Sequence, residues 1–257
     1  MFEFLKSGRR QELRETPLTD EQWQTLDDAV PMLRALPRER RERLGGLVRI
    51  FLAEKHFEGG RGFEVTGDMK LIIAAEACLL LVYREEEVPY PELVNVIVYD
   101  SAWRTKKSQH LGGGVVLESD AANLGESWSI DTVILSWARV ERDAKNGLDG
   151  HNVALHEFAH QLDAQDGTVD GAPQLPSRSR YASWSRVFSE EFETLRTSTH
   201  SDIDDYGAES PPEFFAVVTE QFYEKPGSLA QNHPELFAEL EKFYGVDPRT
   251  LVVPPEG

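Results

Sequence analysis

The 257-residue sequence has little cysteine, little positive charge and no long apolar run, and each shortage excludes a class of protein. Its one cysteine, Cys78, has no partner for an internal disulfide and lies in the apolar stretch "LIIAAEACLLLV", so we expect a core thiol. With 27 Lys and Arg against 45 Asp and Glu, the net charge is −18. Such a chain offers no basic patch to neutralise phosphates, which argues against binding to nucleic acid or to an anionic membrane surface.

The longest apolar stretch, residues 71–82, is interrupted by Glu76 and is too short to span a bilayer. The N-terminal segment "MFEFLKSGRRQELRE" has no apolar region of the signal-peptide kind. We therefore expect a cytoplasmic protein. The Gly112–Gly114 run lacks the Lys-Ser/Thr ending of a phosphate loop, which makes nucleotide binding through it improbable.

The hydrophobic pattern changes twice along the chain. Apolar residues at helical spacing dominate up to about residue 92, and Thr19 with Gln22 forms a capping-box pattern at the start of one helix. β-Branched runs then predict strands, and helical patterns return from Ala138 onward. The predicted strands are 94–99, 112–120 and 131–137, and the predicted later helices are 138–146, 152–164, 179–197, 211–224 and 234–244.

These blocks predict an α+β fold: a helical N-terminal part, residues 1–92, packed on a core of residues 93–257 with a small mixed sheet. Two loops rich in Gly, Pro, Ser and Asp interrupt the C-terminal helices. The first, residues 166–178, is either a lid over a cleft or an ordinary surface connection. The segment "GESWS", residues 125–129, is either a strand edge for an extended peptide or a plain connection.

The segment "HEFAHQLD", residues 156–163, carries the strongest chemical pattern. In a helix, His156 and His160 project from one face a turn apart, so both rings can approach one ion. Glu157 lies about 100° round the helix and can reach a water rather than the ion itself. Because the neighbouring residues are mostly apolar, two histidines here need polar partners, and a zinc ion satisfies both at once.

A catalytic zinc site needs a third protein ligand. The helix pattern "PPEFFAVVTEQF" offers Glu213 and Glu220, seven residues apart on one face and surrounded by apolar residues. A carboxylate in such a helix is costly unless it is paired or binds a metal. The spacing does not decide between the two. The alternative role for Glu220 is to contact a ligand histidine or to form an ordinary ion pair.

"HEFAHQLD" followed by "YGAESPPEFFAVVTE" resembles the Mlc titration factor A family of zinc-dependent peptidases. The metalloprotease core of that family is similar to that of anthrax lethal factor, within the glutamate-ligand zincins. The resemblance implies a zincin-like core in which one zinc per chain is bound by His156, His160 and Glu213. It further implies that Glu157 is the catalytic base and that Tyr206 stabilises the transition state.

The resemblance also implies aminopeptidase-like activity on peptides and, in enteric bacteria, association with a transcriptional repressor of the Mlc type. We therefore predict a zinc-dependent metallopeptidase acting on a peptide or protein substrate. Two alternatives remain open. One is a zinc-stabilised interaction module that binds a regulatory protein, although a purely structural site has no use for Glu157. The other is a zinc hydrolase of a non-peptide bond.

Several further polar residues lie near these motifs. Asp163, on the face of the two histidines, is either an acceptor for a ring N–H or a solvated acid at the helix end. His200 shares the loop of Tyr206 and is its rival as a donor to the oxyanion. The remaining histidines considered are expected to be structural: His56, His110, His151 and His233.

Overall fold

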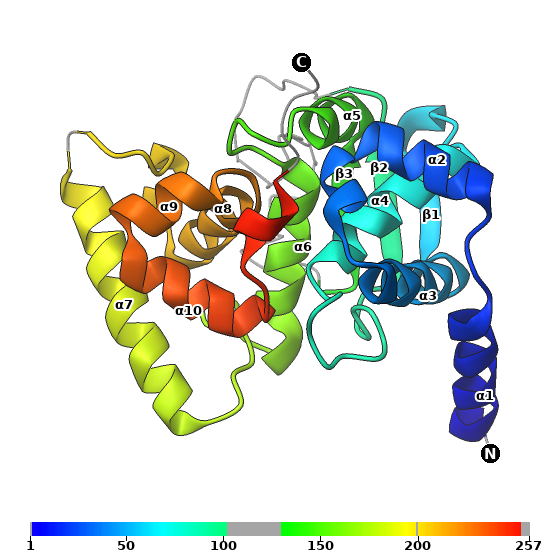
Figure 1. Cartoon of the computed structure of the whole chain (residues 1–257), viewed down its shortest axis with the longest axis horizontal. Coiled ribbons are helices and arrows are strands. Elements are labelled where there is room, and N and C mark those ends of the chain that lie inside the picture. The colour runs from blue at the N-terminus through cyan, green and yellow to red at the C-terminus, as the bar shows by residue number, and fades with distance from the viewer. Residues whose placement is uncertain (1, 102–129, 199, 253–257) are drawn as a thin grey trace.

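The computed structural model describes residues 2–101, 130–198 and 200–252. Helix α6 (Val153–Asp163) runs through the middle of the molecule, with the helices that follow it in sequence on one side and the helices that precede it, together with the sheet, on the other (Figure 1). The N-terminal helices are α1 (Phe2–Glu15), α2 (Asp20–Ala29), α3 (Arg38–Glu54) and α4 (Gly67–Leu79). The later helices are α5 (Trp137–Lys145), α7 (Arg178–Thr197), α8 (Pro211–Glu224), α9 (Pro226–Asn232) and α10 (Pro234–Tyr244).

The sheet consists of β1 (His56–Gly59), β2 (Asn95–Tyr99) and β3 (Thr132–Ser136), hydrogen-bonded in that order. Both pairings are parallel, with Val96 opposite Phe57 on one side and Val133 on the other. Parallel neighbours need a crossover connection, and α4 supplies it between β1 and β2. The structure confirms the predicted strands 94–99 and 131–137, whereas β1 was not predicted.

The expected mixed sheet has only parallel pairs among the described strands. The predicted strand 112–120 and the segment 125–129 lie outside the described residues. The α+β class is confirmed, because helices surround one small sheet. The sheet also joins the two predicted parts, since β1 precedes residue 92 and its partner β2 follows it. The division at residue 92 stays a prediction.

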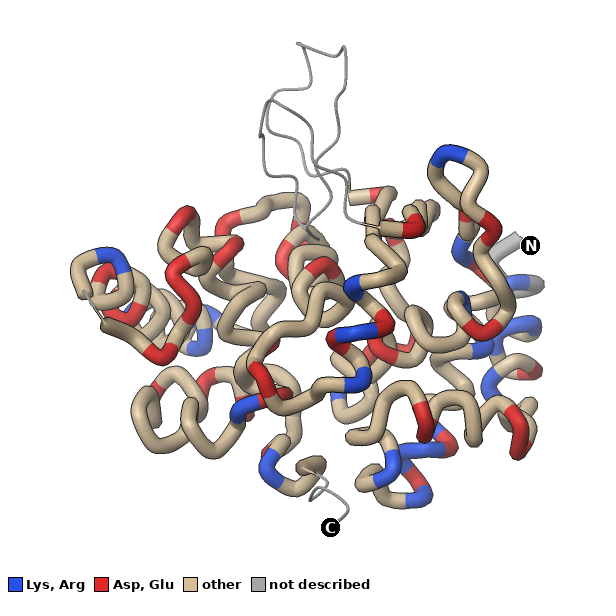
Figure 2. Tube along the Cα trace, turned by 90° about the horizontal axis from the view of Figure 1, so that it is seen from above, with Lys and Arg blue, Asp and Glu red and all other residues tan. Residues whose placement is uncertain are grey.

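Local sequence signals explain where the helices begin. Thr19 caps α2 and forms the predicted capping box with Gln22, and Ser210 caps α8 directly before two prolines. The helices expected near residues 138–146, 152–164, 179–197, 211–224 and 234–244 are all present. No described helix is both long enough and apolar enough to cross a bilayer. Asp and Glu are spread over both sides of the molecule (Figure 2).

The core continues across α6. Phe158 of α6 packs against Phe51 and Tyr90 on the N-terminal side. On the other side, α6 packs against α8, whose aromatic residues contact α7 and α10. All eleven residues of α6 are buried. The central helix is therefore held from both sides, which fixes the direction of every side chain it carries.

The loop 166–178 is attached to its neighbours at two points. Gly171 donates its N–H to Asp163 of α6 over 2.9 Å, and its carbonyl accepts the indole N–H of Trp184 in α7. Leu175 donates its N–H to the hydroxyl of Tyr181. These bonds tie the middle of the loop to α6 and α7. Both alternatives for the loop, a lid or an ordinary surface connection, stay open.

Candidate metal centre

The two histidines of the central helix lie on one face, as their spacing predicts. Asn152 begins α6 by accepting the N–H groups of Ala154 and Leu155. His156 and His160 follow four and eight residues later and are both buried. Their Nε2 atoms lie 3.2 Å apart, so the two rings meet at one point.

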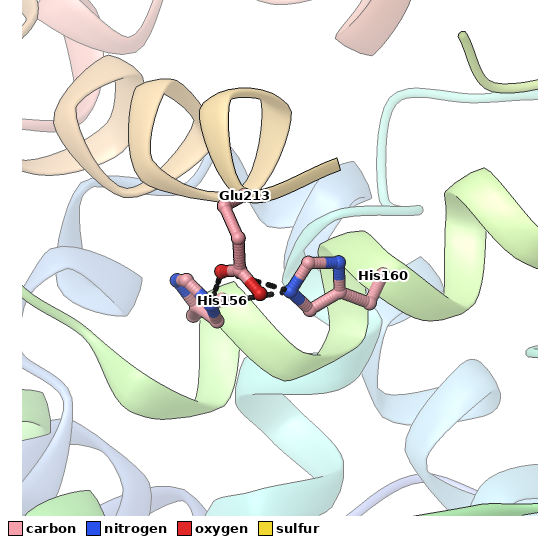
Figure 3. Close-up of side chains that lie close together, drawn as sticks. All are labelled: His156, His160 and Glu213. Atoms are coloured by element: carbon pink, nitrogen blue, oxygen red, sulfur yellow. Dashed lines mark hydrogen bonds and ion pairs between the residues drawn. The ribbon is translucent and has the colours of Figure 1, made fainter. Parts of the chain in front are cut away.

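Helix α8 presents Glu213 to the same point. Glu213 is in the first turn of α8, and its carboxylate is directed toward both histidine rings (Figure 3). Its Oε2 atom lies 3.1 Å from His156 Nε2 and 3.5 Å from His160 Nε2. One ligand atom from each of the three residues falls within 4.8 Å of the others. This is the only such group of three or more potential ligands in the described part of the chain.

Glu220, the other carboxylate considered as a ligand, contacts the opposite nitrogen of His156. Its Oε1 atom lies 2.7 Å from Nδ1, and its Oε2 accepts the backbone N–H of Asn152 over 2.5 Å. A carboxylate only accepts, so Nδ1 carries a hydrogen; Nε2, on the other side of the ring, faces Glu213 and His160 and binds a metal only when it carries no hydrogen of its own. Glu213 and Glu220 lie two turns apart on α8 and contact different nitrogens of the same imidazole, Nε2 and Nδ1 of His156.

The carboxylates of the cluster favour positive charge beside them. Burial lowers the pKa of His156, but the carboxylates of Glu220 and Glu213 outweigh burial and raise it well above its usual value. Burial opposes ionisation of Glu213, yet hydrogen bonds to His156 and His160 lower its pKa to about 2. Burial lowers the pKa of His160. Two imidazoles and a carboxylate are the nitrogen and oxygen ligands that zinc accepts, so the residues fit such an ion.

Glu157 lies beside this cluster with an unused hydrogen-bonding atom. It is buried, and its Oε1 has no hydrogen-bond partner. Burial raises its pKa to about 8, helped by the nearby carboxylates of Glu213 and Glu220 and opposed by His156. A bound dication favours the ionised form of a neighbouring carboxyl. An ion bound beside Glu157 would therefore favour the ionised form of this carboxyl, the form that can accept a proton.

Tyr206 lies in the short helix η4 (Asp205–Ala208), directly before α8. Its backbone N–H donates to Asp204, and its half-buried ring lies 5.9 Å from the ring of His156, centroid to centroid. Burial raises the pKa of its hydroxyl, and the carboxylate of Glu213 raises it further. The structure thus brings Tyr206 to the cluster.

The rival of Tyr206, His200, is exposed and lines a different cavity, of about 420 Å³, with Asp202 and His233. In that cavity, His233 contacts Glu191 through Nδ1 over 2.7 Å and Asp202 through Nε2 over 2.8 Å. His233 therefore ties α7 to the loop that leads to Tyr206. His56 and His151 are exposed, and His110 lies outside the described residues.

Asp163 has neither of the two surroundings considered for it, a ring N–H of His156 or solvent at the helix end. It is fully buried, and its Oδ2 accepts the N–H of Gly171, whereas its Oδ1 has no hydrogen-bond partner. The acceptor for the ring N–H of His156 is Glu220 instead.

The sequence interpretation also missed Asn152, although a residue of this type directly before an apolar helix is a common N-cap.

The model of the glucose-regulated metallo-peptidase M90 family matches residues 5–245. The chain belongs to this family. The predicted resemblance is thereby confirmed, and membership implies a metallopeptidase-type function with a metal cofactor. An uncharacterized protein of Synechocystis sp. is 38% identical over 93% of this chain and 89% of its own length. The Mlc titration factor A of Escherichia fergusonii is 30% identical over 86% and 84%, and that of Serratia proteamaculans is 27% identical over 88% and 87%.

Proposed function

We propose that this member of the family is a zinc-dependent peptidase of the HExxH type with a glutamate as third ligand. The observation that carries the proposal is the convergence of His156 Nε2, His160 Nε2 and a carboxylate oxygen of Glu213. In this proposal Glu220 orients His156. Its carboxylate accepts the hydrogen of Nδ1, which leaves Nε2 free to bind the ion.

The catalytic roles that we propose follow from the positions of the side chains. Zinc, when bound, supplies Lewis acidity. Glu157 accepts a proton from the attacking water at Oε1, the atom without a partner, and later delivers it to the leaving amine. The hydroxyl of Tyr206 donates to the oxyanion that develops on the scissile carbonyl. The buried apolar surroundings of α6 and α8 limit competing water.

An aminopeptidase-like preference and a cytoplasmic location remain predictions from the sequence. A second candidate function comes from the name of the relatives in Escherichia fergusonii and Serratia proteamaculans, which describes titration of Mlc. On this proposal the chain also binds a repressor protein of the Mlc type. A third candidate, hydrolysis of a non-peptide bond at the same centre, differs only in substrate.

Metal content and hydrolysis, measured on the same preparations, test the proposal. Purified protein reconstituted with zinc should hold one zinc per chain by elemental analysis and should cleave members of a short-peptide library. A chelator should abolish cleavage, and zinc should restore it. The variant His160→Ala should lose the metal, whereas His233→Ala, a histidine outside the cluster, should keep it.

The other outcomes separate the candidates. A zinc-loaded protein that cleaves no peptide but binds a purified repressor of the Mlc type is an interaction module. Cleavage of an ester or amide panel without cleavage of peptides points to the non-peptide hydrolase. Failure to retain zinc after reconstitution would remove the basis of the whole proposal.

A further inference from the structure

A second cavity, of about 290 Å³, lies away from the metal centre. It is lined by α4, the end of α5 with the segment 146–148, the beginning of α6, the end of α8, and the two short helices η1 (Pro31–Ala35) and η5 (Pro248–Leu251). None of His156, His160, Glu213, Glu157 and Tyr206 lines it. The volume suits a small organic molecule, since ligand pockets begin at about 300 Å³.

Two buried carboxyl groups line this cavity, and each has one unused oxygen. Glu76 of α4 is 0% exposed; its Oε1 accepts an N–H of the Asn152 amide over 2.8 Å, and its Oε2 has no hydrogen-bond partner. Glu224 of α8 is 1% exposed; its Oε2 accepts the N–H of Gly150 over 3.0 Å, and its Oε1 has no partner. A buried polar atom without a partner is costly, so two in one cavity call for a ligand.

The rest of the lining is apolar and extends to the surface. Leu79, Leu155 and Tyr223 form part of the buried wall. Leu148 and Val252 are 51% and 41% exposed, and they are two of the three large hydrophobic residues that the described chain exposes. An apolar rim above acidic groups suits a ligand with a cationic head and an apolar body.

The acidic pair is unsuited to a metal ion. A metal cage needs at least three ligands, and the only group of three among the described residues is the one at the metal centre. The two basic side chains that line the cavity are already paired, Lys145 with Glu141 and Arg34 with Asp28. The carboxyl groups therefore remain available for a cation brought by the ligand.

We propose that this cavity binds a small organic cation, a primary ammonium or guanidinium group on a short apolar body, through Glu76 Oε2 and Glu224 Oε1. Two N–H groups of such a head donate to the two unused oxygens, one to each, and the body lies against the apolar wall. Without a ligand, burial raises the pKa of Glu76 to about 8 and that of Glu224 to about 9. Both groups are then neutral at pH 7, and binding of the singly charged head is balanced by the loss of one proton from this pair of carboxyl groups to the solvent.

Calorimetry with the full chain at pH 7 tests the proposal with n-hexylammonium and n-hexylguanidinium as probes. Their matched controls are 1-hexanol, which has the body without the charge, and hexanoate, which carries the opposite charge. We expect at least one cation to bind about tenfold or more tighter than 1-hexanol, since hydrogen bonds to charged groups contribute about 1.5–3 kcal/mol. Hexanoate should not bind.

Variants locate the site. Glu76→Gln and Glu224→Gln should each weaken cation binding about tenfold or more, because the amide keeps the shape and loses the charge. Leu148→Arg, at an exposed position of the rim, should also weaken it without touching the core. Glu239→Gln is the control, because Glu239 is buried elsewhere, beside Arg180 and Ser183.

Three outcomes would overturn the proposal. The first is equal affinity for 1-hexanol and for both cations, which makes the cavity a plain apolar pocket. The second is unchanged cation binding in both glutamine variants and in Leu148→Arg. The third is the absence of saturable binding by either cation to the correctly folded protein. None of these measurements involves the metal centre, so they do not depend on the proposed function.

Discussion

Helices α4 and α8 are both buried and both contact α6, yet they carry very different side chains. In α4, the buried stretch Leu71–Leu79 contains one acid, Glu76. In α8, the buried stretch Pro212–Glu224 contains Glu213, Glu220 and Glu224. A buried carboxyl group is costly in either helix. The two helices differ in the groups that contact their buried carboxyl groups.

The contrast between Glu76 and Glu213 shows that partners, rather than residue type, set the charge. Burial raises the pKa of Glu76 to about 8, and its one side-chain hydrogen bond, from Asn152, only partly opposes this. Hydrogen bonds to His156 and His160 overcome burial at Glu213 and lower its pKa to about 2. One helix thus serves mainly the core, whereas the other supplies a charged group to the proposed site.

The largest effect is expected from removing the charged groups of α8. Glu213→Ala should reduce zinc affinity by more than about 100-fold, because it removes a proposed zinc ligand. Loss of a side chain that only contacts a ligand usually costs less, about 10–100-fold. Glu220→Ala should cost about 10–100-fold, since it only releases the ring of His156. Competition with a chelator of known affinity measures both. If Glu220→Ala proves the weaker binder, the two roles are reversed.

Glu157→Gln on α6 should keep the zinc and lose turnover. The amide preserves the shape of the side chain but cannot accept the proton, and loss of a general base commonly costs about 10²–10⁴-fold. Peptide hydrolysis by the zinc-loaded variant, with metal content measured in parallel, checks this. Undiminished kcat would take Glu157 out of the mechanism and favour the interaction module.

Tyr206→Phe removes only a hydroxyl from the segment before α8. Zinc content and KM should hardly change, while kcat should fall by about 10²–10³-fold, as for other donors to an oxyanion. His200→Ala is the control, because His200 is exposed and lines the other cavity. A loss of kcat in His200→Ala and none in Tyr206→Phe would exchange their roles.

The apolar positions of α4 should respond to a change in side-chain volume. Ile73 is fully buried, so Ile73→Val should lower the free energy of unfolding by about 0.5–1.5 kcal/mol through one lost methylene. Zinc affinity should stay at the wild-type value. Urea unfolding of the two proteins measures the first quantity. A shift in zinc affinity would show that α4 affects the metal centre, contrary to the comparison.

The smallest effect concerns the partly exposed cluster of His233, Glu191 and Asp202. Hydrogen bonds to the two carboxylates raise the pKa of His233 to about 9 from an ordinary 6.5, against the effect of burial. Its contribution to stability is therefore fully present below pH 6.5 and is lost as the pH rises through about 9. The Tm difference between wild type and His233→Gln, followed from pH 5 to about pH 10, should shrink over that window. A constant difference contradicts this.

The sequence predicted the parts of the site that depend on spacing along one helix. His156 and His160 share a face because four residues make about one turn. Glu213 and Glu220 also share a face, so only the crossing of α8 over α6 decides which one meets both Nε2 atoms. β1 escaped prediction because "HFEG" has no β pattern of its own and is held by its pairing with β2. The roles of Glu76 and Asn152 depend on helices that are distant in sequence.

The three contacts of Asn152 restrict which residues can replace it. Its Oδ1 caps α6, its side-chain NH₂ donates to Glu76, and its backbone N–H donates to Glu220. Among good N-cap residues, only Asn supplies both an acceptor and an NH₂ donor. Asp would cap the helix but face Glu76 without a hydrogen to donate. An exchange of Asn152 for Asp should therefore be better tolerated together with Glu76→Gln, because the new amide supplies an N–H between the two side chains.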